Sequence, residues 1–375
     1  MPNISRSFGG PVESLIGYVK ASAQQSIQTD VAAPVGGKDE KNWLQQQLPG
    51  SKLFLFTSYG RHAWVTSPGL WMWLKKNEVN YDLIHIHGLF NPVSSFSATI
   101  CRKKGFLYII RPFGTLSRYT FSRTRWFKKP WFSLIDLTNL KEANGVHFTT
   151  NEEYEEANRL EISLKEKKVI IPPPYRSNFL DSGVPSEKFP DPVCLYMSRL
   201  HPKKNIEGLL YAWEKVLNAF PSARLIIAGS GDRAYTNSLQ QLSQKLELQD
   251  SIEFTGFVTG EKKNRLLSNS WIFALPSHQE NFGVAVLEAI ACGLPVVISR
   301  DVQLANFVTA SNTGMVVSKE ATGIADAIIE LFEDKEFRER CRVKGPESVR
   351  LNFSLEQIGQ KLHGVYSEVS SQHIG

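Results

Sequence analysis

A strand–helix–strand unit near the C-terminal end constrains the fold of this 375-residue chain more than any other stretch. Residues 271–275 form a short apolar run ended by Pro276 and Ser277, which is typical of a buried strand, and a polar loop follows. An apolar helix over about 283–292 is ended by Gly293 and Pro295, and a second buried strand is predicted over 296–299. These elements form a βαβ unit, which indicates an α/β fold.

Two glutamates lie eight positions apart in this unit. Glu288 lies in the apolar helix, where an unpaired carboxylate is costly, so the sequence predicts a partner for it. Glu280 lies in the loop beyond the carboxyl end of the first strand, at the edge where open α/β sheets bind ligands. The backbone N–H groups of Asn281, Phe282 and Gly283 begin the helix, and a helix N-terminus attracts anions such as phosphate. A sugar joined to a nucleotide diphosphate offers the hydroxyls and the charge that such a site binds.

The spacing of these glutamates also resembles a family signature. The E-x7-E motif in E-N-F-G-V-A-V-L-E is similar to that of retaining glycosyltransferases with the GT-B fold, family 4. The resemblance implies two Rossmann-like, doubly wound domains with a cleft between them. The alternative interpretation is a Glu280 that caps the helix and a Glu288 that has a purely structural partner.

Length and composition predict a two-domain globular protein. A chain of 375 residues is too long for one ordinary core. The chain has no run of 18 apolar residues and no signal-peptide pattern at its start, which predicts a cytoplasmic location, with the inner face of the membrane as a further option. A net charge of +6 allows an anionic partner, but no spacing typical of nucleic-acid binding is present. The four cysteines lie far apart, which favours core residues over a disulfide framework or a metal site.

The N-terminal stretch departs from the family pattern. Residues 1–8 are mostly polar and lead directly into Gly9 and Gly10, before a helix predicted from residue 12. In the family a buried first strand precedes such a Gly-Gly loop, which approaches the donor phosphates or the acceptor. We therefore expect the first strand of the N-terminal domain to be missing, because the start lies upstream or because this domain is impaired. A surface Gly-Gly turn is the alternative.

Two later strands of the N-terminal half end in residues of interest. A strand over 82–87 ends at His87 in H-I-H-G-L-F, which resembles the strand-end histidine motif of the family, so that His87 could contact the acceptor or the donor phosphates. A strand histidine is more often structural. The next strand, over 106–111, is followed by Phe113 at a position where many relatives carry a histidine that contacts the transferred sugar.

Residues 118–132 combine five cations and six aromatic side chains without an acid, in R-Y-T-F-S-R-T-R-W-F-K-K-P-W-F, from Arg118 to Phe132. Such a combination suits peripheral contact with a membrane or with a lipid phosphate. A solvated helix whose aromatic side chains pack inward is the alternative.

The C-terminal half begins with a strand over 193–198 and a turn that carries Arg199 and Lys204. These cations lie at the ligand edge of the sheet, where they can neutralise a diphosphate, and Asn205 is predicted to cap the following helix. The motif S-R-L-H-P-K-K-N resembles the family's G-R-L-x-x-x-K-G, and surface cations are the alternative.

The next strand, over 224–228, is followed by Gly229 and Gly231. The resemblance implies that their backbone approaches the donor closely. With Ala234 they also satisfy G-x-G-x-x-A, the dinucleotide fingerprint, and Glu253 follows about 20 residues on. An NAD-type oxidoreductase is therefore the alternative function, although Asp232 to Ala234 is a poor tight entry to a helix.

The resemblance implies an N-terminal acceptor-side domain over 1–185, a nucleotide-sugar domain over 186–352 and a final helix over 353–375 that crosses back. The expected reaction moves a sugar, with retention, from a UDP- or GDP-sugar to a hydroxyl of a glycan or lipid-linked acceptor in polysaccharide biosynthesis. Glu280 would hold sugar hydroxyls and Glu288 the ribose, while Arg199 and Lys204 take the role of a metal on the leaving diphosphate, so that neither metal nor cofactor is needed. A non-catalytic relative that only binds glycan or protein is a third hypothesis.

Overall fold

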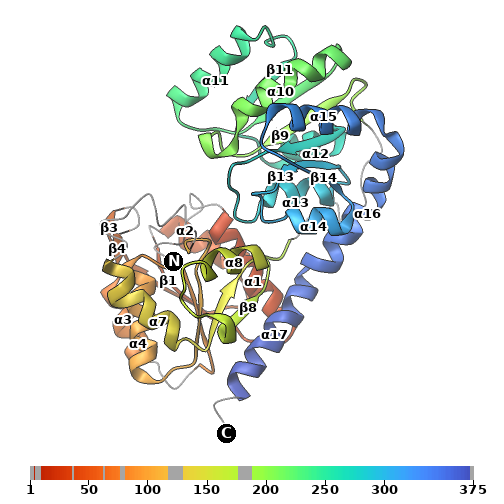
Figure 1. Cartoon of the computed structure of the whole chain (residues 1–375). Coiled ribbons are helices and arrows are strands. Elements are labelled where there is room, and N and C mark those ends of the chain that lie inside the picture. The colour runs from red at the N-terminus through yellow and green to blue at the C-terminus, as the bar shows by residue number, and fades with distance from the viewer. Residues whose placement is uncertain are drawn as a thin grey trace. The chain divides into compact units, whose positions relative to one another are not determined.

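The computed structural model describes residues 4, 10–35, 38–61, 64–76, 81–116, 130–175 and 188–371. The chain forms two compact units (Figure 1). Unit 1 comprises residues 1–174 and 353–375, and unit 2 comprises residues 175–352.

Unit 2 is built on one parallel sheet of six strands in the order β11-β10-β9-β12-β13-β14. This order reverses direction between β9 and β12, as in a doubly wound sheet. The strands of the centre are fully buried because Val, Ile and Leu cover both faces. Their bounds are β9 (Val193–Met197), β10 (Arg224–Ala228), β11 (Ile252–Gly256), β12 (Ile272–Leu275), β13 (Val296–Ser299) and β14 (Gly314–Val317).

The βαβ unit predicted from the sequence is present as β12, α13 and β13, with Phe273 opposite Val296 in parallel register. Helix α13 is less completely buried than predicted, because Val284 at its start is exposed. The helices of unit 2 are α10 (Ile206–Ala219), α11 (Arg233–Lys245), α12 (Gly260–Asn269), α13 (Val284–Ala291), α14 (Ala305–Ser311), α15 (Ala321–Glu333) and α16 (Lys335–Phe353).

Unit 1 contains a four-stranded parallel sheet in the order β5-β6-β7-β8 and a separate parallel pair, β1 and β2. An antiparallel hairpin, β3 with β4, follows β2. The sequence did not predict β1 or the hairpin. The bounds are β1 (Val31–Val35), β2 (Leu53–Thr57), β3 (Tyr59–Arg61), β4 (Trp64–Thr66), β5 (Ile84–His87), β6 (Tyr108–Arg111), β7 (Gly145–Phe148) and β8 (Lys168–Ile170).

One residue of the N-terminal stretch pairs with β1. The N–H group of Ile4 donates to Pro34 O at 3.0 Å, Ile4 forms a parallel bridge with Val35, and its side chain is buried. The sequence predicts no strand here, because residues 1–8 are mostly polar. The structure corrects this at one position, since an apolar side chain that packs beside β1 is buried despite its polar neighbours.

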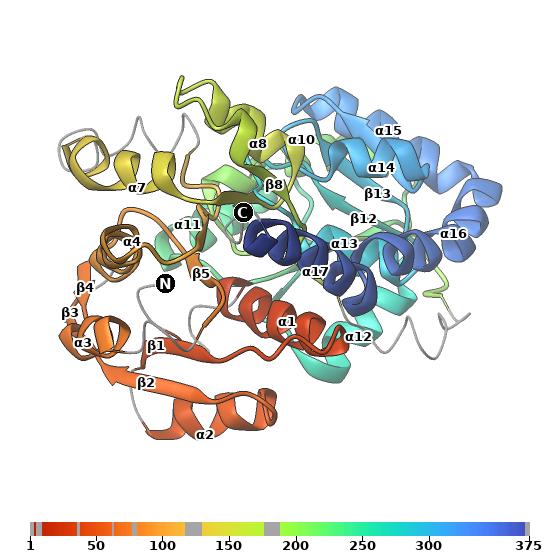
Figure 2. The same cartoon turned by 90° about the horizontal axis from the view of Figure 1, so that it is seen from below.

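Helices α1 and α17 pack against each other in unit 1, although they lie near opposite ends of the chain; Figures 1 and 2 show them side by side. Tyr18 and Ala21 of α1 form one apolar cluster with Ile358 and Leu362 of α17. The close contact depends on Gly359, because a Cβ there would lie 2.4 Å from Ala21 O. The helices of unit 1 are α1 (Gly10–Gln24), α2 (Lys38–Gln47), α3 (Pro68–Lys76), α4 (Pro92–Lys104), the π-helix η3 (Phe132–Asp136), α7 (Leu137–Glu142), α8 (Asn151–Asn158) and α17 (Leu355–Ser371).

Candidate functional site

The turn after β9 presents two cations at the carboxyl edge of the sheet in unit 2. Arg199 is exposed, and Lys204 ends a short 3-10 turn, η5 (Pro202–Lys204), that leads into α10. The backbone N–H of Lys203 donates to Nδ1 of His201 at 3.1 Å, which fixes the start of this turn. Both predicted cations therefore lie in one strand-to-helix connection.

The predicted cap of α10 is wrong in its mechanism. Asn205 has a left-handed backbone with φ of 54°, and its side chain makes no capping hydrogen bond. Its Nδ2 instead donates to Lys319 O at 3.0 Å. The amide lies against Gly208 in the first turn of α10, where a Cβ would be 2.5 Å from Oδ1 of Asn205, but its hydrogen bond goes to the loop after β14.

The loop between β12 and α13 is held by the segment that follows β13. The N–H of Glu280 donates to Asp301 O at 3.1 Å, and Glu280 O accepts from the N–H of Gln303 at 3.2 Å. Ser299 Oγ donates to Ser277 O at the start of the loop. These bonds fix the backbone of Glu280 on a rigid support beyond the ends of two neighbouring strands.

Lys204 and Glu280 form an ion pair between the two loops. Their side chains are only 14% and 19% exposed. Burial, followed by the charges of Arg199 and Lys203, lowers the pKa of Lys204 to about 8. The carboxylate beside it opposes this shift. The structure thus brings together Arg199, Lys204 and Glu280.

Glu288 has a partner, as the sequence predicts, but this partner is a lysine of another helix and not a residue of the Lys204–Glu280 pair. Lys263 of α12 donates to its Oε1 at 2.5 Å, and the two side chains are 28% and 15% exposed. Lys263 could not be predicted as this partner, because it lies 25 positions away on another helix. The ion pair explains how α13 tolerates a carboxylate, and a ribose would have to compete with Lys263.

The N-terminus of α13 adjoins Glu280. Gly283 precedes the helix with φ of 79°, a conformation that favours glycine, and a Cβ there would lie 3.4 Å from Cγ of Glu280. Asn281 is exposed and Phe282 is buried. The predicted anion site and the predicted sugar-binding carboxylate therefore lie against each other in one loop.

Gly229 and Gly231 serve the packing of two loops. A Cβ on Gly229 would lie 1.9 Å from Ser198 O, and one on Gly231 would lie 2.1 Å from Leu200 O. Leu200 N donates to Ser230 O at 3.0 Å across this contact. The glycines are required because the turn after β10 lies directly on the turn that carries Arg199, whether or not a donor approaches them.

The dinucleotide fingerprint fits the structure only in part. Asp232 caps α11 by accepting from the N–H groups of Ala234 and Tyr235, so the prediction of a poor helix entry is wrong. Glu253, however, is an exposed residue of β11 that pairs with Arg224 at 3.0 Å. Glu253 lies opposite Ile226, inside the strand rather than at its carboxyl end, which does not suit a carboxylate that binds ribose.

His87 lies in unit 1, at the carboxyl end of β5, and is buried. Its ring centroid lies 4.7 Å from that of His85 and 5.6 Å from that of Phe113. Burial lowers the pKa of His87 well below its ordinary value, and the neighbouring His85 and Arg111 add to the effect. His87 is therefore a neutral imidazole near pH 7, and its buried Nδ1 has no hydrogen-bond partner in the described residues.

Three further residues of this cluster were missed by the sequence analysis because they come from other elements. His147 Nδ1 lies 3.1 Å from His85 Nε2, and the hydroxyl of Tyr18 donates to Ile171 O at 3.0 Å. The buried guanidinium of Arg111 stacks on the ring of Tyr18, with its carbon 4.7 Å from the centroid. In the described part of the chain Nε and Nη1 of Arg111 have no hydrogen-bond partner.

A cavity of about 960 Å³ in unit 1 is lined by residues of both β1 and β5. Ile4 and Trp73 contribute to its apolar wall, and Tyr18, His85 and His87 contribute polar groups. The predicted histidine thus lies in the wall of a cavity, although its own side chain is largely buried.

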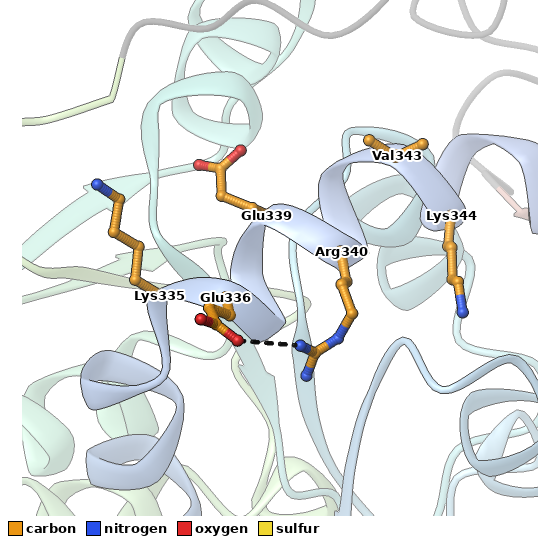
Figure 3. A pocket seen from close by; sticks show the side chains of 6 residues that line it. All are labelled: Lys335, Glu336, Glu339, Arg340, Val343 and Lys344. Carbon is orange, nitrogen blue, oxygen red and sulfur yellow. Dashed lines mark ion pairs between the residues drawn. The ribbon is translucent and has the colours of Figure 1, made fainter.

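The remaining predicted residues add little. Gly10 is the exposed first residue of α1, and a Cβ there would meet no atom within 4 Å. Gly9 and residues 118–129 lie outside the described residues. A second hollow, of about 570 Å³, lies along α16 and is lined by Lys335, Glu336, Glu339, Arg340, Val343 and Lys344 (Figure 3). All six come from one helix, α16, and none was predicted as a site residue.

The fold and the loops at the carboxyl edge of unit 2 define a Rossmann-like α/β protein of the GT-B type. Two solved structures share this fold: a glycosyltransferase from Rickettsia africae ESF-5, with a TM-score of 0.75 and 18% identity over 98% of this chain and 97% of that one, and Anabaena Alr3699/HepE in complex with UDP, with a TM-score of 0.72 and 18% identity over 98% of each chain.

Residues 182–348 match the family model described as Glycosyl transferases group 1. The chain therefore contains a group 1 glycosyltransferase domain that coincides with most of unit 2. It is 33% identical to an uncharacterized glycosyltransferase, MJ1607, of Methanocaldococcus jannaschii over 176 residues, which cover 46% of this chain and 44% of that protein. The chain spans less than half the length of the first curated relatives that it matches.

In the part of the chain that the structure describes, no helix is both long and apolar enough to cross a membrane.

Proposed function

We propose that this chain is a retaining glycosyltransferase of family 4 that moves a sugar from a nucleotide-diphosphate sugar to a hydroxyl acceptor. The observation that carries this proposal is the ion pair of Lys204 with Glu280 beside Arg199. A group 1 glycosyltransferase domain over residues 182–348 supports it.

Unit 2 would bind the donor at the carboxyl edge of its sheet. In this proposal Lys204 leaves Glu280 and binds the diphosphate together with Arg199, while the freed carboxylate of Glu280 accepts hydrogen bonds from sugar hydroxyls. The N-terminus of α13 adds partial positive charge beside the same loop. Glu288 would bind the ribose by exchanging Lys263 for hydroxyl groups.

The same residues would assist departure of the leaving group. The bond between the anomeric carbon and the diphosphate oxygen breaks, a bond to the acceptor oxygen forms on the same face, and the hydroxyl proton of the acceptor passes to the leaving diphosphate. Negative charge develops on the diphosphate, and preorganised donors aimed at such charge commonly supply the largest catalytic contribution. Arg199 and Lys204 are placed for that role.

Unit 1 would bind the acceptor. The cavity beside His87 offers an apolar wall and neutral ring nitrogens, which suit an uncharged hydroxyl-bearing molecule. We infer that a glycan or a lipid-linked glycan occupies it and that His87 orients the attacking hydroxyl.

Titration calorimetry with UDP, GDP and NAD tests donor binding. We expect a uridine or guanosine diphosphate to bind wild type, and Lys204→Ala to weaken binding at least about tenfold because a charge-assisted bond is lost. Lys215→Ala is the matched control, since Lys215 also pairs with a carboxylate, that of Asp326, but on an exposed surface. Preferential binding of NAD would contradict the proposal and favour an oxidoreductase.

Turnover requires a separate test. Donor consumption with a panel of glycosyl and lipid-linked acceptors, followed by NMR of the anomeric proton of the product, should show retention in wild type and loss of product for Glu280→Gln. Binding without turnover across the panel would support the non-catalytic hypothesis, and an inverted product would contradict the proposed mechanism.

A further inference from the structure

Unit 1 exposes large apolar side chains from four neighbouring elements: the hairpin of β3 and β4, α3, α4 and η3. Leu134 is 78% exposed, Met72 is 59% exposed and Trp64 is 48% exposed. Helix α4 contacts α3, β4 and η3. We call this surface the aromatic face, and it comprises Tyr59, Trp64, Trp71, Met72, Phe96, Trp131 and Leu134.

Four rings of the aromatic face, those of Trp64, Trp131, Phe96 and Trp71, form one continuous row of contacts. The ring of Trp131 lies 5.0 Å from that of Trp64 and 5.7 Å from that of Phe96. Phe96 lies 5.2 Å from Trp71. Trp131 Nε1 donates to Ser95 Oγ at 3.0 Å, so its polar group is satisfied within the protein. Contiguous exposed apolar surface of this kind marks an interaction site, whereas single exposed residues do not.

Positive charge accompanies the aromatic face. Lys75 and Lys76 lie one turn beyond Met72 on α3, and Lys103 lies two turns beyond Phe96 on the same side of α4. All three lysines are exposed. Among the described residues of β3, β4, α3, α4, η3 and α7, the only exposed acid is Glu142, since Asp136 is fully buried.

We propose that the aromatic face docks unit 1 on the surface of a bilayer that contains anionic phospholipids. Tryptophan and tyrosine favour the boundary between headgroups and acyl chains, and lysines beside them favour anionic headgroups. A second copy of the chain is a poorer occupant, because a two-fold contact through this face would bring its lysines close to their counterparts. The inference does not depend on the proposed transfer reaction.

Flotation of the full chain with vesicles tests the inference without any donor or acceptor. We expect binding to vesicles of phosphatidylcholine mixed with phosphatidylglycerol, weaker binding to phosphatidylcholine alone, and a decrease as salt is raised. Leu134→Asp and Met72→Asp should each reduce the bound fraction about tenfold, because a charge enters the apolar layer. Lys75→Gln with Lys76→Gln should reduce the preference for anionic vesicles.

Phe257→Asp is the matched control, because Phe257 is 76% exposed and belongs to unit 2. It should bind vesicles as wild type does. Failure of wild type to float with anionic vesicles, or equal binding by Leu134→Asp, would overturn the inference. If wild type does not bind vesicles but forms a concentration-dependent dimer, and Leu134→Asp disrupts that dimer, the aromatic face would instead be a self-association surface.

Discussion

Lys204 and Glu280 belong to two loops that the sequence places at the ligand edge of the sheet in unit 2, and in the structure they form an ion pair. Both belong to loops beyond the carboxyl ends of β9 and β12, two adjacent strands of the sheet. The backbone of Glu280 is held by two hydrogen bonds, and Lys204 ends a turn fixed by His201. Their side chains are therefore positioned by the fold before any ligand arrives.

The lowered pKa of Lys204 predicts a pH dependence of nucleotide binding. Its ordinary pKa of 10.5 falls to about 8 in the folded protein, so the charge that attracts a diphosphate is lost as pH rises through about 8. The association constant for UDP should then fall by up to about tenfold per pH unit. Calorimetry between about pH 7 and pH 9.5 should show this slope in wild type.

Lys204→Arg is the control for this prediction, because a guanidinium stays protonated throughout the range. The variant should lose the slope even if its affinity differs. Equal slopes in both proteins would show that another group governs the titration.

Arg111 allows a second prediction, about a buried charge in unit 1. It is 2% exposed, with two nitrogens that lack partners in the described residues. Burial and, after it, the charge of Arg111 lower the pKa of His85 to about 3. Arg111→Met should therefore raise the pKa of His85 in an NMR titration, while burial keeps it below 6.5.

The same change should alter how stability depends on acid. Between pH 6.5 and about 3 the unfolded chain protonates His85 and the folded chain does not, so the free energy of unfolding falls as pH falls in this window. In Arg111→Met the pKa of His85 in the folded protein should be higher, so the pH range over which stability falls should begin at 6.5 as before but end at a higher pH. An unchanged pKa of His85 would contradict the assigned role of Arg111.

At the scale of elements, the contact between the turns after β9 and β10 is the tightest part of the site. Gly231→Ala would place a Cβ 2.1 Å from Leu200 O, so the two turns must separate. We expect a loss of about 1–3 kcal/mol in the free energy of unfolding of unit 2. Weaker UDP binding should accompany it, because Arg199 moves with the turn. Urea denaturation and calorimetry measure the two effects.

Gly364→Ala provides a matched comparison within α17. A Cβ at Gly364 would meet no atom within 4 Å, so alanine should stabilise the helix by up to about 1 kcal/mol. Equal effects of the two substitutions would refute the steric argument.

The elements that the sequence predicted well are those whose own residues determine them. Strands β12 and β13 are uninterrupted apolar runs, and Gly293 and Pro295 end α13 between them. Strand β1 was not predicted because Ala and Pro interrupt its short sequence V-A-A-P-V, and its stability comes from pairing with β2.

The candidate site shows the same division. Arg199, Lys204 and Glu280 could be predicted because each follows the end of a recognisable strand. Lys263 and Arg111 could not be predicted, because the residues that they affect belong to other segments. Lys263 pairs with Glu288, and Arg111 lowers the pKa of His85. Asn205 was assigned to the right position with the wrong contact, since its left-handed backbone arises from the packing of the whole turn.

At the scale of the molecule, unit 1 is completed by the last helix of the chain. Ile358 and Leu362 of α17 cover Tyr18, Ala21 and Ile171. A chain that ends after residue 352 would expose this cluster. We expect such a truncation to lower the melting temperature of unit 1 and to increase binding of a hydrophobic dye, while UDP binding by unit 2 persists.

Ile358→Ala with Leu362→Ala keeps the chain full-length and should produce a weaker form of the same effect, because two large apolar side chains leave the contact. Loss of UDP binding in the truncated chain, with an unaltered unit 1, would contradict this assignment of α17.

The pairing of Lys204 with Glu280 has a consequence for selectivity under the proposed function. Each charge already has an internal counter-ion. An anion can therefore bind Lys204 only if Glu280 is left without its partner in a loop that is poorly hydrated. Inorganic phosphate brings neither sugar hydroxyls for Glu280 nor a nucleoside that makes further contacts with unit 2, so nothing offsets that loss. A sugar nucleotide compensates for the loss, because its hydroxyls take the place of the lysine at the carboxylate of Glu280. The ion pair should therefore make the site selective for a sugar nucleotide over abundant small anions.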